Sequence, residues 1–461
     1  MPPAFDAFGT CAAAVDVTLA SFGDDAALAA RQRQRLLRLL AHAARHSPLY
    51  REILGSIQPQ DVDLASLPVQ RKPALMQRFD DWVTEPALRL DALRRFTADR
   101  ALMGADFAGR YVVWESSGSS GEPGIFVQDA AAMAVYDALE GVRPGQLRPP
   151  RSPLDPRLGG PIAFVGAVDG HFASTVSVER LRRLNPWLRR RLHSLSFLQP
   201  LPELLDALQR LAPAAIATYP SLAVLLAEEY AAGRLTHAPR EIWTGGETLS
   251  AGMRRFVQQC FGCPVVDHYG TSEFFTLASE CHAGRLHVNS DWAILEPVDE
   301  QGRPALPGEP CATTLLTNLA NHVQPLIRYD LGDRVAWHPA RCECGSRLPA
   351  ILVQGRSDDI LRLKLPGRRS VAVTPLALTT VLEDEAGLFD FQLVQQAGDQ
   401  LELSTRLSGA VVDQVLRRAR RALADFLAGQ GAPGVRIRCC SGIARPRGRS
   451  GKAKRISVAM K

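Results

Sequence analysis

The sequence predicts an α/β protein, in which a large N-terminal domain with mostly parallel sheets precedes a small α+β C-terminal domain. Short β-branched runs alternate with helical segments between residues 161 and 262, a rhythm typical of parallel sheets with helices on both faces. The composition, 46% hydrophobic and 22% charged, is that of a globular protein. Beyond about residue 359 the pattern changes to a short strand–helix unit, so we expect domains at 1–357 and 358–461.

The size and charge of the chain exclude several classes of protein. A chain of 461 residues can bury a large core. Its net charge of +6 is small and its arginines are scattered among acids, which does not favour a nucleic-acid partner. No uncharged apolar run is long enough to span a membrane, and the first residues lack the basic lead of a secretory signal. We therefore expect a cytoplasmic protein with no membrane partner, whose nine cysteines are mostly free thiols.

The first 100 residues or so form a helical segment. Residues 24–44 are rich in Ala, Leu, Arg and Gln at helical spacing, and the run stops before the turn signal Ser47-Pro48. A loop at 67–73 and further helical sequence lead to the first predicted strand, at residues 110–114.

Directly after that strand comes a loop, residues 115–124, with four serines and three glycines. Glycines let the backbone approach a ligand closely, and inward-turned amide N–H groups and hydroxyls suit a phosphate. The alternative is a flexible serine/glycine linker, but a strand pattern resumes at 124–128, which indicates a turn within a domain. The loop lacks the Lys-Ser/Thr ending of a P-loop, so a triphosphate here needs a lysine from elsewhere.

The central region alternates strands and helices, which we place at residues 162–165 (strand), 201–211 (helix), 215–219 (strand), 221–232 (helix), 241–244 (strand) and 263–266 (strand). Ligands of such sheets bind at the carboxyl ends of the strands. Two polar motifs come there, Thr-Gly-Gly-Glu at 244–247 and Asp-His-Tyr-Gly-Thr-Ser-Glu at 267–273. Each is a turn in its simplest interpretation, but together they offer an aromatic ring, hydroxyls and carboxylates for a base and a magnesium ion.

Further along, charged residues stand beside glycines at 325–334 and at 355–359. A carboxylate there suits ribose hydroxyls and an arginine suits phosphate, whereas a surface ion-pair network is the alternative. An arginine-rich helix at about 411–428 precedes a basic tail at 445–455, in which Lys452 supplies the lysine that the serine loop lacks.

Taken in order, six motifs resemble those of the AMP-forming acyl-adenylate superfamily over nearly the whole chain: the serine loop, Gly-Gly-Glu, Tyr-Gly-Thr-Ser-Glu, Arg-Tyr-Asp-Leu-Gly-Asp, Gly-Arg-Ser-Asp-Asp and Ser-Gly-Lys. The stretches at 47–51 and 67–72 resemble the phenylacetate–CoA ligase branch. The resemblance implies a large adenylate-forming domain and a ligase. Such an enzyme converts ATP and a carboxylic acid to an acyl-adenylate and pyrophosphate, and then transfers the acyl group to a thiol.

The resemblance also implies an ATP site, whose members are Ser116, Ser117, Gly118, Ser119, Ser120, Gly121, Gly245, Gly246, Glu247, His268, Tyr269, Gly270, Thr271, Ser272, Glu273, Asp333 and Arg356. The serine loop would wrap the β- and γ-phosphates, and the Gly-Gly-Glu run would border the adenine with Tyr269 against its face. Thr271 or Ser272 would contact the α-phosphate, and Glu273 would hold Mg²⁺. Asp333 would bind the ribose hydroxyls, with Arg356 close to ribose and phosphate.

Lys452 would be the catalytic lysine that bridges the attacking carboxylate and the α-phosphate. Charge builds on the α-phosphate oxygens as pyrophosphate leaves, and a positioned ammonium group lowers that barrier. Lys454 is the competitor, and the Gly451-Lys452 pair favours Lys452. Asp358 would be the hinge about which the small, mobile domain turns between the two half-reactions, a motion that removes Lys452 and admits the thiol.

Cysteines and a histidine in two short clusters suit tetrahedral zinc: Cys281 with His287, and Cys342 with Cys344. His282 competes with His287, and four unconnected buried residues are the alternative. Some members of the branch carry a structural zinc at corresponding positions, which implies a site that pins this segment and takes no part in catalysis.

In this branch the acid is usually aromatic, such as a benzoate, hydroxybenzoate or phenylacetate. The residues that would line its flat pocket are Phe164, His171, Phe172, Tyr219, Trp243 and His268. Each of them, taken singly, is equally explained as a core residue.

The resemblance implies that the acceptor is CoA or the phosphopantetheine arm of an acyl carrier protein. Past the hinge the sequence lacks the Gly-x-Asn loop usual in the branch and has four cations instead, Arg362, Lys364, Arg368 and Arg369. They suit the phosphates of CoA, the acidic face of a carrier protein, or simply solvent. An adenylating enzyme with an amine acceptor, a non-catalytic nucleotide-binding homologue and a homodimer are the remaining alternatives.

Overall fold

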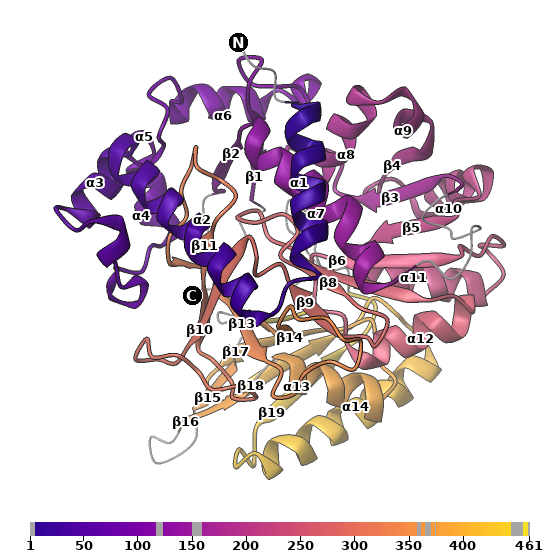
Figure 1. Ribbon diagram of the computed structural model, residues 1–461. Coiled ribbons are helices and arrows are strands. Elements are labelled where there is room, and N and C mark those ends of the chain that lie inside the picture. The colour runs from indigo at the N-terminus through magenta and orange to yellow at the C-terminus, as the bar shows by residue number, and fades with distance from the viewer. Residues whose placement is uncertain are drawn as a thin grey trace.

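The computed structural model describes residues 5–116, 123–149, 159–356, 361–364, 370–373, 375–443 and 455–459 (Figure 1). Its first hundred residues are helical, as predicted, and the elements are α1 (Ala7–Ala20), α2 (Asp25–His46), α3 (Pro48–Leu54), α4 (Lys72–Gln77), α5 (Phe79–Trp82), α6 (Leu90–Ala98) and the short 3₁₀ turns η1 (Pro59–Asp61), η2 (Leu64–Ser66) and η3 (Arg100–Leu102). The predicted helix at 24–44 is α2, which Asp24 caps by accepting a hydrogen bond from the amide of Ala27. Ser47 in turn caps α3, so the chain re-enters a helix at Pro48.

A hairpin and a long helix follow, β1 (Val112–Glu115), β2 (Ile125–Gln128) and α7 (Ala130–Leu147). The two strands are antiparallel, with Glu115 opposite Ile125. The serine-rich loop therefore connects two paired strands, as the resumption of the strand pattern predicts. The N-terminal helices, the hairpin and α7 share one hydrophobic core with later strands, which contribute residues such as Ala278, Leu316 and Ile351.

The centre of the molecule is a nine-stranded sheet in the order β13-β14-β9-β8-β7-β6-β5-β3-β4. Its strands are β3 (Ile162–Gly166), β4 (Leu192–Ser196), β5 (Ala215–Thr218), β6 (Glu241–Gly245), β7 (Val265–Tyr269), β8 (Ala278–Glu280), β9 (Leu286–Val288), β13 (Asp333–Trp337) and β14 (Ala350–Arg356). From β4 to β7 all neighbours are parallel, which confirms the predicted α/β class. The strands from β8 to β13 run antiparallel, a half of the sheet that the sequence pattern does not anticipate.

Helices connect the parallel strands, and they are α8 (Ala173–Leu184), α9 (Pro186–Arg191), α10 (Leu201–Leu211), α11 (Pro220–Ala231) and α12 (Ala251–Phe261). Three of them, α10 to α12, pack on one face of the sheet over a second core. Beside the sheet lies a three-stranded one made of β10 (Ala293–Val298), β11 (Thr313–Asn318) and β12 (Tyr329–Asp330). Among the described residues, no helix has the combination of length and apolar character needed to cross a membrane.

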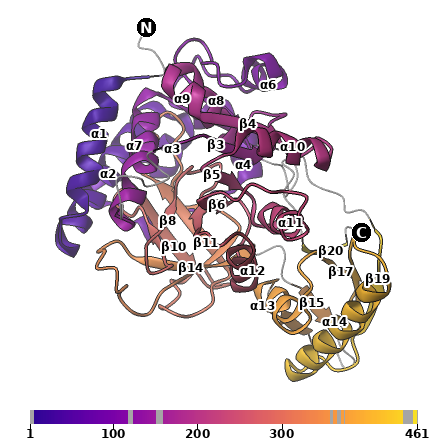
Figure 2. The ribbon, with the colours of Figure 1, turned by 90° about the vertical axis from the view of Figure 1, so that its right-hand side faces the viewer.

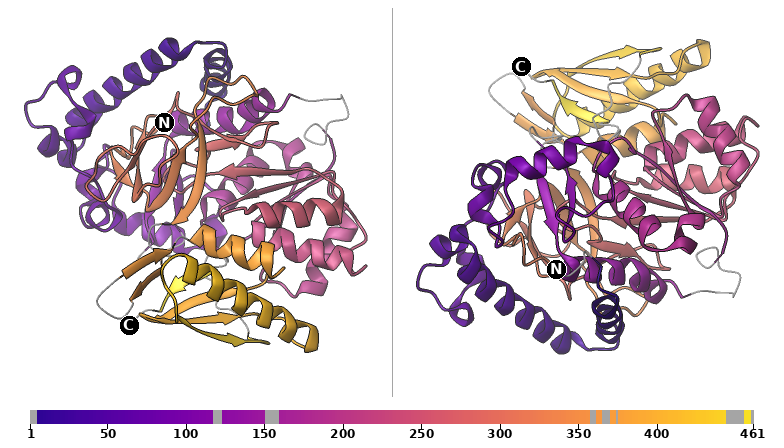
Figure 3. Two further views of the ribbon diagram at one scale, coloured as in Figure 1. Left: turned by 90° about the horizontal axis from the view of Figure 1, so that it is seen from below. Right: turned by 90° about the horizontal axis from the view of Figure 1, so that it is seen from above.

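We define the C-terminal unit as the described residues beyond 360. Its elements are β15 (Leu361–Lys364), β16 (Ser370–Val373), α13 (Pro375–Thr380), a π-helix (Val381–Glu385), β17 (Gln392–Ala397), β18 (Gln400–Ser404), α14 (Ala410–Gly429), β19 (Arg436–Cys440) and β20 (Ile456–Val458). Its mixed sheet, β19-β18-β17-β20, encloses a separate core with α14. Figure 2 shows the unit as a distinct body beside α12, and Figure 3 shows that it lies away from the N-terminal helices. The predicted boundary at 357/358 and the hinge Asp358 fall outside the described residues.

Candidate active site

The carboxyl ends of β6 and β7 form an edge that only glycine permits. At Gly245 a Cβ would lie 3.0 Å from the carbonyl oxygen of His268, and Gly246 has a φ of +77°. At Gly270 a Cβ would lie 1.9 Å from the carbonyl oxygen of Phe275. The strand β7 runs on to Tyr269, three residues beyond the predicted end at 266, because His268 and Tyr269 pair with β8. The result is a narrow edge of backbone flanked by polar side chains.

Three predicted site residues from distant motifs meet at one carboxylate. The Tyr269 hydroxyl donates a hydrogen bond of 2.7 Å to Asp333 Oδ2, and Arg356 Nη1 donates one of 3.2 Å to Asp333 Oδ1. Burial, followed by the neighbouring Asp333 charge, raises the pKa of Tyr269 well above its ordinary value, so the phenol stays a donor. Asp333 and Arg356 are opposite each other on β13 and β14. The predicted ribose carboxylate and its arginine are thus held in one place.

Glu273 is positioned by a residue to which the sequence assigned no role. The Tyr329 hydroxyl donates a hydrogen bond of 2.8 Å to Glu273 Oε1, and the backbone carbonyl of Glu273 accepts one of 2.9 Å from Asn318 Nδ2. Tyr329 precedes Asp330 in the Arg-Tyr-Asp-Leu-Gly-Asp motif, which was the only signal for it. Tyr329 and Tyr269 therefore orient one carboxylate each, Glu273 and Asp333.

Hydrogen bonds join the two ends of the serine loop and connect the preceding strand to the Tyr-Gly-Thr-Ser-Glu motif. The Ser116 amide donates to the Gly124 carbonyl, and the Gly124 amide donates to Ser116 Oγ, both at 2.8 Å. Trp114, the last but one residue of β1, donates from Nε1 to the carbonyl of Ser272 at 2.7 Å. The other predicted members of this loop, Ser117, Gly118, Ser119, Ser120 and Gly121, lie outside the described residues.

A lysine that the sequence did not single out for this site lies at the foot of the serine loop. A Cβ on Gly124 would come within 3.2 Å of Lys72 Cδ, so the Lys72 side chain passes directly over the loop. The sequence predicted the missing cation only at Lys452, which lies outside the described residues, as does Lys454. The structure thus brings a second cation to the serine loop, one that spacing along the chain could not reveal.

Thr271 and Glu247 serve the backbone of their own loops. Thr271 Oγ1 accepts from the amide of Phe274, and the Thr271 amide donates to the Phe274 carbonyl, so the loop after Gly270 is a tight turn. Glu247 Oε2 accepts a hydrogen bond of 3.1 Å from the amide of Ser221, near the start of α11. Both residues lie at the strand ends where the ATP site was predicted.

The six aromatic and histidine residues predicted for the acid pocket separate into two groups. Phe172 and Tyr219 pack in the core under α10 to α12. His171 is fully buried, with Nε2 3.0 Å from the carbonyl oxygen of Asp99 and its ring against Phe96. These three belong to the protein interior.

The other three share one face of the parallel sheet. Pairing of Phe164 with Ala217 and of Ala217 with Trp243 sets their side chains on the same side, and His268, paired with Gly245, joins them. Phe164 and Trp243 are half-buried, and neither ring belongs to any of the hydrophobic clusters formed by the described residues. Burial, with a contribution from Arg148, lowers the pKa of His268 to about 4, so its ring is neutral at pH 7.

Four metal-ligating side chains meet near β8 and β9. The ligand atoms of Cys281, His287, Cys342 and Cys344 all lie within 4.8 Å of one another. The Cys281 and Cys342 sulfurs are 3.7 Å apart, and Cys344 Sγ is 3.3 Å from His287 Nε2. Zinc–sulfur bonds of about 2.3 Å in a tetrahedron place sulfurs about 3.8 Å apart, so these donors fit zinc.

The partner of the second ring nitrogen selects between the two histidines. His287 Nδ1 lies 2.7 Å from the carbonyl oxygen of Leu348, an arrangement that leaves Nε2 as the metal-facing nitrogen. The competitor His282 instead directs Nδ1 to the carbonyl oxygen of Leu147, at 3.3 Å. The set that the sequence predicted is therefore the one that the fold assembles.

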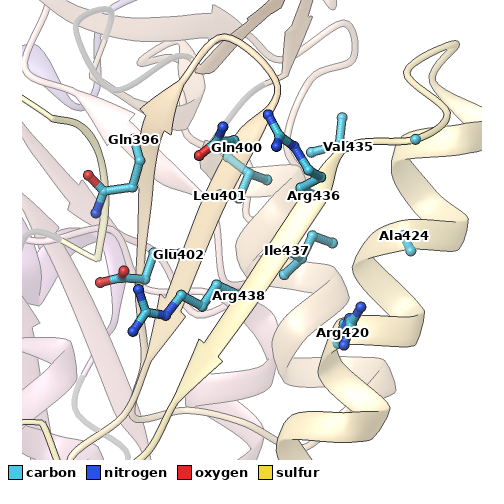
Figure 4. Close-up of a pocket in the computed structure, with 11 residues that line it drawn as sticks. Gln396, Gln400, Leu401, Glu402, Arg420, Ala424, Val435, Arg436, Ile437 and Arg438 are labelled. Atoms are coloured by element: carbon cyan, nitrogen blue, oxygen red, sulfur yellow. The ribbon is translucent and has the colours of Figure 1, made fainter.

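A cavity of about 660 Å³ lies on the C-terminal unit, apart from the residues described above. Figure 4 shows Arg420 of α14 facing β18 and β19, which carry Gln400, Glu402, Arg436 and Arg438. The lining comes from one domain and includes none of the predicted site residues.

Comparison with known proteins shows which families this chain resembles. Residues 193–312, which span β4 to the loop before β11, match the family model described as AMP-binding enzyme. The phenylacetate-coenzyme A ligase of Thermus thermophilus is 26% identical over 380 residues, which cover 77% of this chain and 75% of that protein. These matches confirm the predicted resemblance to the AMP-forming acyl-adenylate superfamily and the predicted fold class.

Solved structures share its fold over most of the chain. A 2-hydroxyisobutyryl-CoA ligase in the postadenylation state, 21% identical, covers 93% of this chain with 89% of its own and has a TM-score of 0.68. The same ligase in the thioesterification state, with CoA, gives a TM-score of 0.55. A benzoate CoA ligase from Burkholderia xenovorans, 17% identical, covers 76% of this chain with 69% of its own at a TM-score of 0.50.

Proposed function

We propose that this chain is an ATP-dependent acid–thiol ligase that activates an aromatic carboxylic acid as its acyl-adenylate and then transfers the acyl group to CoA. The observation that carries the first half is the convergence of Tyr269, Asp333 and Arg356, together with Glu273 and its partner Tyr329. A carboxylate and an arginine from the adjacent strands β13 and β14 suit the ribose and phosphate of a nucleotide. We assign adenine to the bare backbone edge at Gly245 and Gly246.

The charge arrangement supports chemistry at a triphosphate. Lys72 lies over Gly124 at the foot of the serine loop, and Lys452 is the second cation that we assign to the reaction. Glu273, oriented by Tyr329, supplies the oxygen ligand that Mg²⁺ prefers, and the ion would offset charge on the phosphates when bound. Positioned cations stabilise the charge that develops as pyrophosphate leaves.

The half-buried face with Phe164, Ala217 and Trp243 supports an aromatic acid. Two rings flank a methyl group on one face of the sheet, and we propose that they form a slot for a planar group. Trp243 is fixed from below, because its Nε1 donates a hydrogen bond of 2.6 Å to Glu241 and Glu241 pairs with Arg148 at 2.8 Å. Trp243 lies two residues below the strand end at Gly245, about 7 Å along β6, a depth that suits one aromatic ring.

We predict that Trp243 limits the length of the acid. In Trp243→Ala the slot should become deeper along β6, away from Gly245. Activity with a medium-chain alkyl acid should therefore rise about tenfold relative to benzoate or phenylacetate. The ratio of kcat/KM values in ATP–pyrophosphate exchange measures this change. Trp187 is 56% exposed on α9, and its alanine variant is the matched control with an unchanged ratio. An unaltered preference in Trp243→Ala would place the acid elsewhere.

CoA is our proposed acceptor because the phenylacetate-coenzyme A ligase relative and the ligase structures carry it in their names. Of the four cations proposed to meet it, Arg362 lies 3.5 Å from Glu300 across the two domains, and Lys364 is exposed at the end of β15. Arg368 and Arg369 lie outside the described residues. The phosphopantetheine arm of a carrier protein is the second acceptor to test.

We further propose that Cys281, His287, Cys342 and Cys344 hold one structural zinc, which would fix β8 and β9 next to the segment 342–348. The homodimer stays a prediction, supported by the exposed apolar residues of the first helix and its end, Phe8, Val15, Leu19 and Phe22. The cytoplasmic location also stays a prediction.

The experiment that tests the function is ATP–pyrophosphate exchange against a panel of aryl and alkyl acids. We expect exchange that depends on an aryl acid, followed by a thioester product when CoA is added. The same assay with a carrier protein bearing its phosphopantetheine arm separates the two acceptors. Protein that binds ATP but shows no exchange with any acid would overturn the proposal in favour of a non-catalytic homologue.

A further inference from the structure

The contact between the C-terminal unit and α12 is built around one buried carboxylate. Glu383, in the π-helix, has a side chain with no exposed surface. Ser250 Oγ donates a short hydrogen bond to Glu383 Oε2, and Arg455 Nη1 lies 2.6 Å from Glu383 Oε1. Ser250 is the N-cap residue of α12 in the N-terminal domain, whereas Arg455 directly precedes β20. One carboxylate therefore joins the two parts of the molecule.

The surroundings of Glu383 are shaped for this contact. A Cβ on Gly252 would come within 2.9 Å of Glu383 Oε2 and 3.1 Å of Asp384 Oδ1, so a larger residue here would crowd both carboxylates. Arg455 is held from the side of its own unit, since Nη2 donates to the Phe389 carbonyl at 2.9 Å and its guanidinium lies 4.1 Å from the Phe391 ring centre.

Two further pairs border the buried contact. The rings of Phe256, on α12, and Phe389, in the C-terminal unit, stack with centres 5.1 Å apart. Asp384 Oδ1 lies 2.6 Å from Arg255 Nη2 in a more exposed pair. The interface thus combines an apolar contact with neighbouring polar contacts, and the Glu383 side chain is fully buried within it.

A buried carboxylate strongly favours the domain arrangement in which its hydrogen-bond and ion-pair partners are present. Burying the charge costs desolvation free energy, which hydrogen bonds and an opposite charge offset. Removal of one partner leaves that desolvation cost without its compensation. Here one partner comes from each domain. A rotation of the C-terminal unit would separate Glu383 from Ser250, whereas Arg455 would travel with it. The contact therefore discriminates between orientations of the unit.

We infer that Glu383 is a positioning residue that stabilises the adenylating orientation of the C-terminal unit and has to release Ser250 before acyl transfer. The inference rests on the proposed two-step ligase function. It is supported by the higher TM-score with the postadenylation structure, 0.68, than with the thioesterification structure of the same ligase, 0.55. Arg455 also stands three residues after Lys452 in the sequence, so the contact anchors the end of the segment with the proposed catalytic lysine.

The test measures the two half-reactions separately in Glu383→Gln. The amide keeps an acceptor for Ser250 but loses the ion pair with Arg455. We expect acid-dependent ATP–pyrophosphate exchange to fall about tenfold in kcat. Thioester formation from CoA and chemically supplied acyl-adenylate should stay within about twofold of the wild type or rise. Gly252→Val, which crowds the same contact from the side of α12, should shift the two rates in the same way.

The control is Asp399→Asn, which removes the exposed Asp399–Arg436 pair of the same unit and should change neither rate. An equal fall in both half-reactions would show a merely structural role for Glu383, and no fall in either would show no role, so each would overturn the inference. Hydrogen exchange of the α12 amides should also be faster in Glu383→Gln. If the wild type shows no exchange of pyrophosphate with any acid, the proposed function fails, whereas the α12 result still reports on the contact.

Discussion

At the scale of single residues, the candidate site depends on side chains that orient one another. The Asp333 carboxylate accepts hydrogen bonds from Tyr269 and Arg356, and the Glu273 carboxylate accepts one from Tyr329. None of these pairs is closer than 23 residues in the sequence, the separation of Asp333 and Arg356. Each carboxylate is thus placed by the fold and not by its own motif.

Asp333→Asn should weaken the binding of ATP and leave the acid unaffected. The amide keeps one oxygen but cannot accept from Tyr269, Arg356 and two ribose hydroxyls at once. We expect the KM for ATP to rise about 10- to 100-fold with a smaller change in the KM for the acid. Asp330→Asn is a comparison in the same motif, since Asp330 pairs with Thr313 and Arg71 away from this cluster. Equal rises of KM for both substrates would contradict the assignment.

Asp267 should make stability depend on pH. Burial raises its pKa from 3.8 to about 7, so the folded protein keeps the proton up to about pH 7 while the unfolded chain releases it near pH 4. The folded state then binds more protons, and stability falls as the pH rises from about 4 to 7. Asp267→Asn keeps an acceptor for Thr244 Oγ1, which now donates to Asp267 at 2.7 Å.

The Asn variant should therefore be more stable than the wild type above pH 7, by on the order of 4 kcal/mol, and about equally stable near pH 4. Denaturant unfolding at pH 5, 6, 7 and 8 measures the difference. A difference that does not change with pH would mean that Asp267 is ionised throughout, paired with the nearby Arg254 charge.

At the scale of elements, strand ends and short hairpins carry the function. The edge at β6 and β7 exists because Gly245 and Gly270 leave room for neighbouring carbonyl groups. A metal bound by the cysteine and histidine set would tie the short strands β8 and β9, three residues each, to the segment that leads into β14. Such short strands are weakly stabilised by pairing alone, so a metal there would have a structural role.

His287→Ala should remove the zinc and lower the melting temperature. We expect one zinc per wild-type chain by elemental analysis and much less in the variant, with a fall of several degrees in Tm, because the metal stabilises only the folded state. The KM values in pyrophosphate exchange should be unchanged below that temperature. His282→Ala is the matched control and should keep its zinc, as its ring faces Leu147. A metal-free wild type would show that the cluster is a set of buried thiols.

At the scale of the whole molecule, two parts with separate cores meet at α12. The core of the C-terminal unit contains Leu403 on β18, whereas Leu226 on α11 belongs to a core of the N-terminal domain. The polar contact around Glu383 and the Phe256–Phe389 stack join these parts, whose fully buried residues form separate clusters. We therefore expect the unit to unfold in a step of its own.

Calorimetry of the full chain should show two transitions. Leu403→Ala should destabilise one of them by about 2–5 kcal/mol and leave the other in place, because its cavity forms within a single core. Leu226→Ala should do the same to the other transition. A single transition that both variants lower would show that the two parts unfold as one cooperative unit.

Much of this architecture was predictable because its signals are local. The alternation of strands and helices between 161 and 262 follows from the burial of parallel strands, and α2, α10, α11 and α14 lie within two residues of their expected bounds. The strand β7 is longer than predicted, since pairing with β8 extends it through polar residues. The antiparallel half of the sheet was missed because its strands are short and carry no helical spacing between them.

The sequence by itself predicted which residues would carry the chemistry: the motif order indicated a resemblance to the superfamily, and the spacing of four cysteine and histidine residues indicated a candidate metal set. Only the tertiary structure decided how they meet. It placed Lys72 at the serine loop, set Tyr329 on Glu273, separated Phe164 and Trp243 from the buried His171, and joined Glu383 to Ser250. The physical reason is that residue type and local spacing select the chemistry of a side chain, whereas its partners come from segments brought together by burial of the common cores.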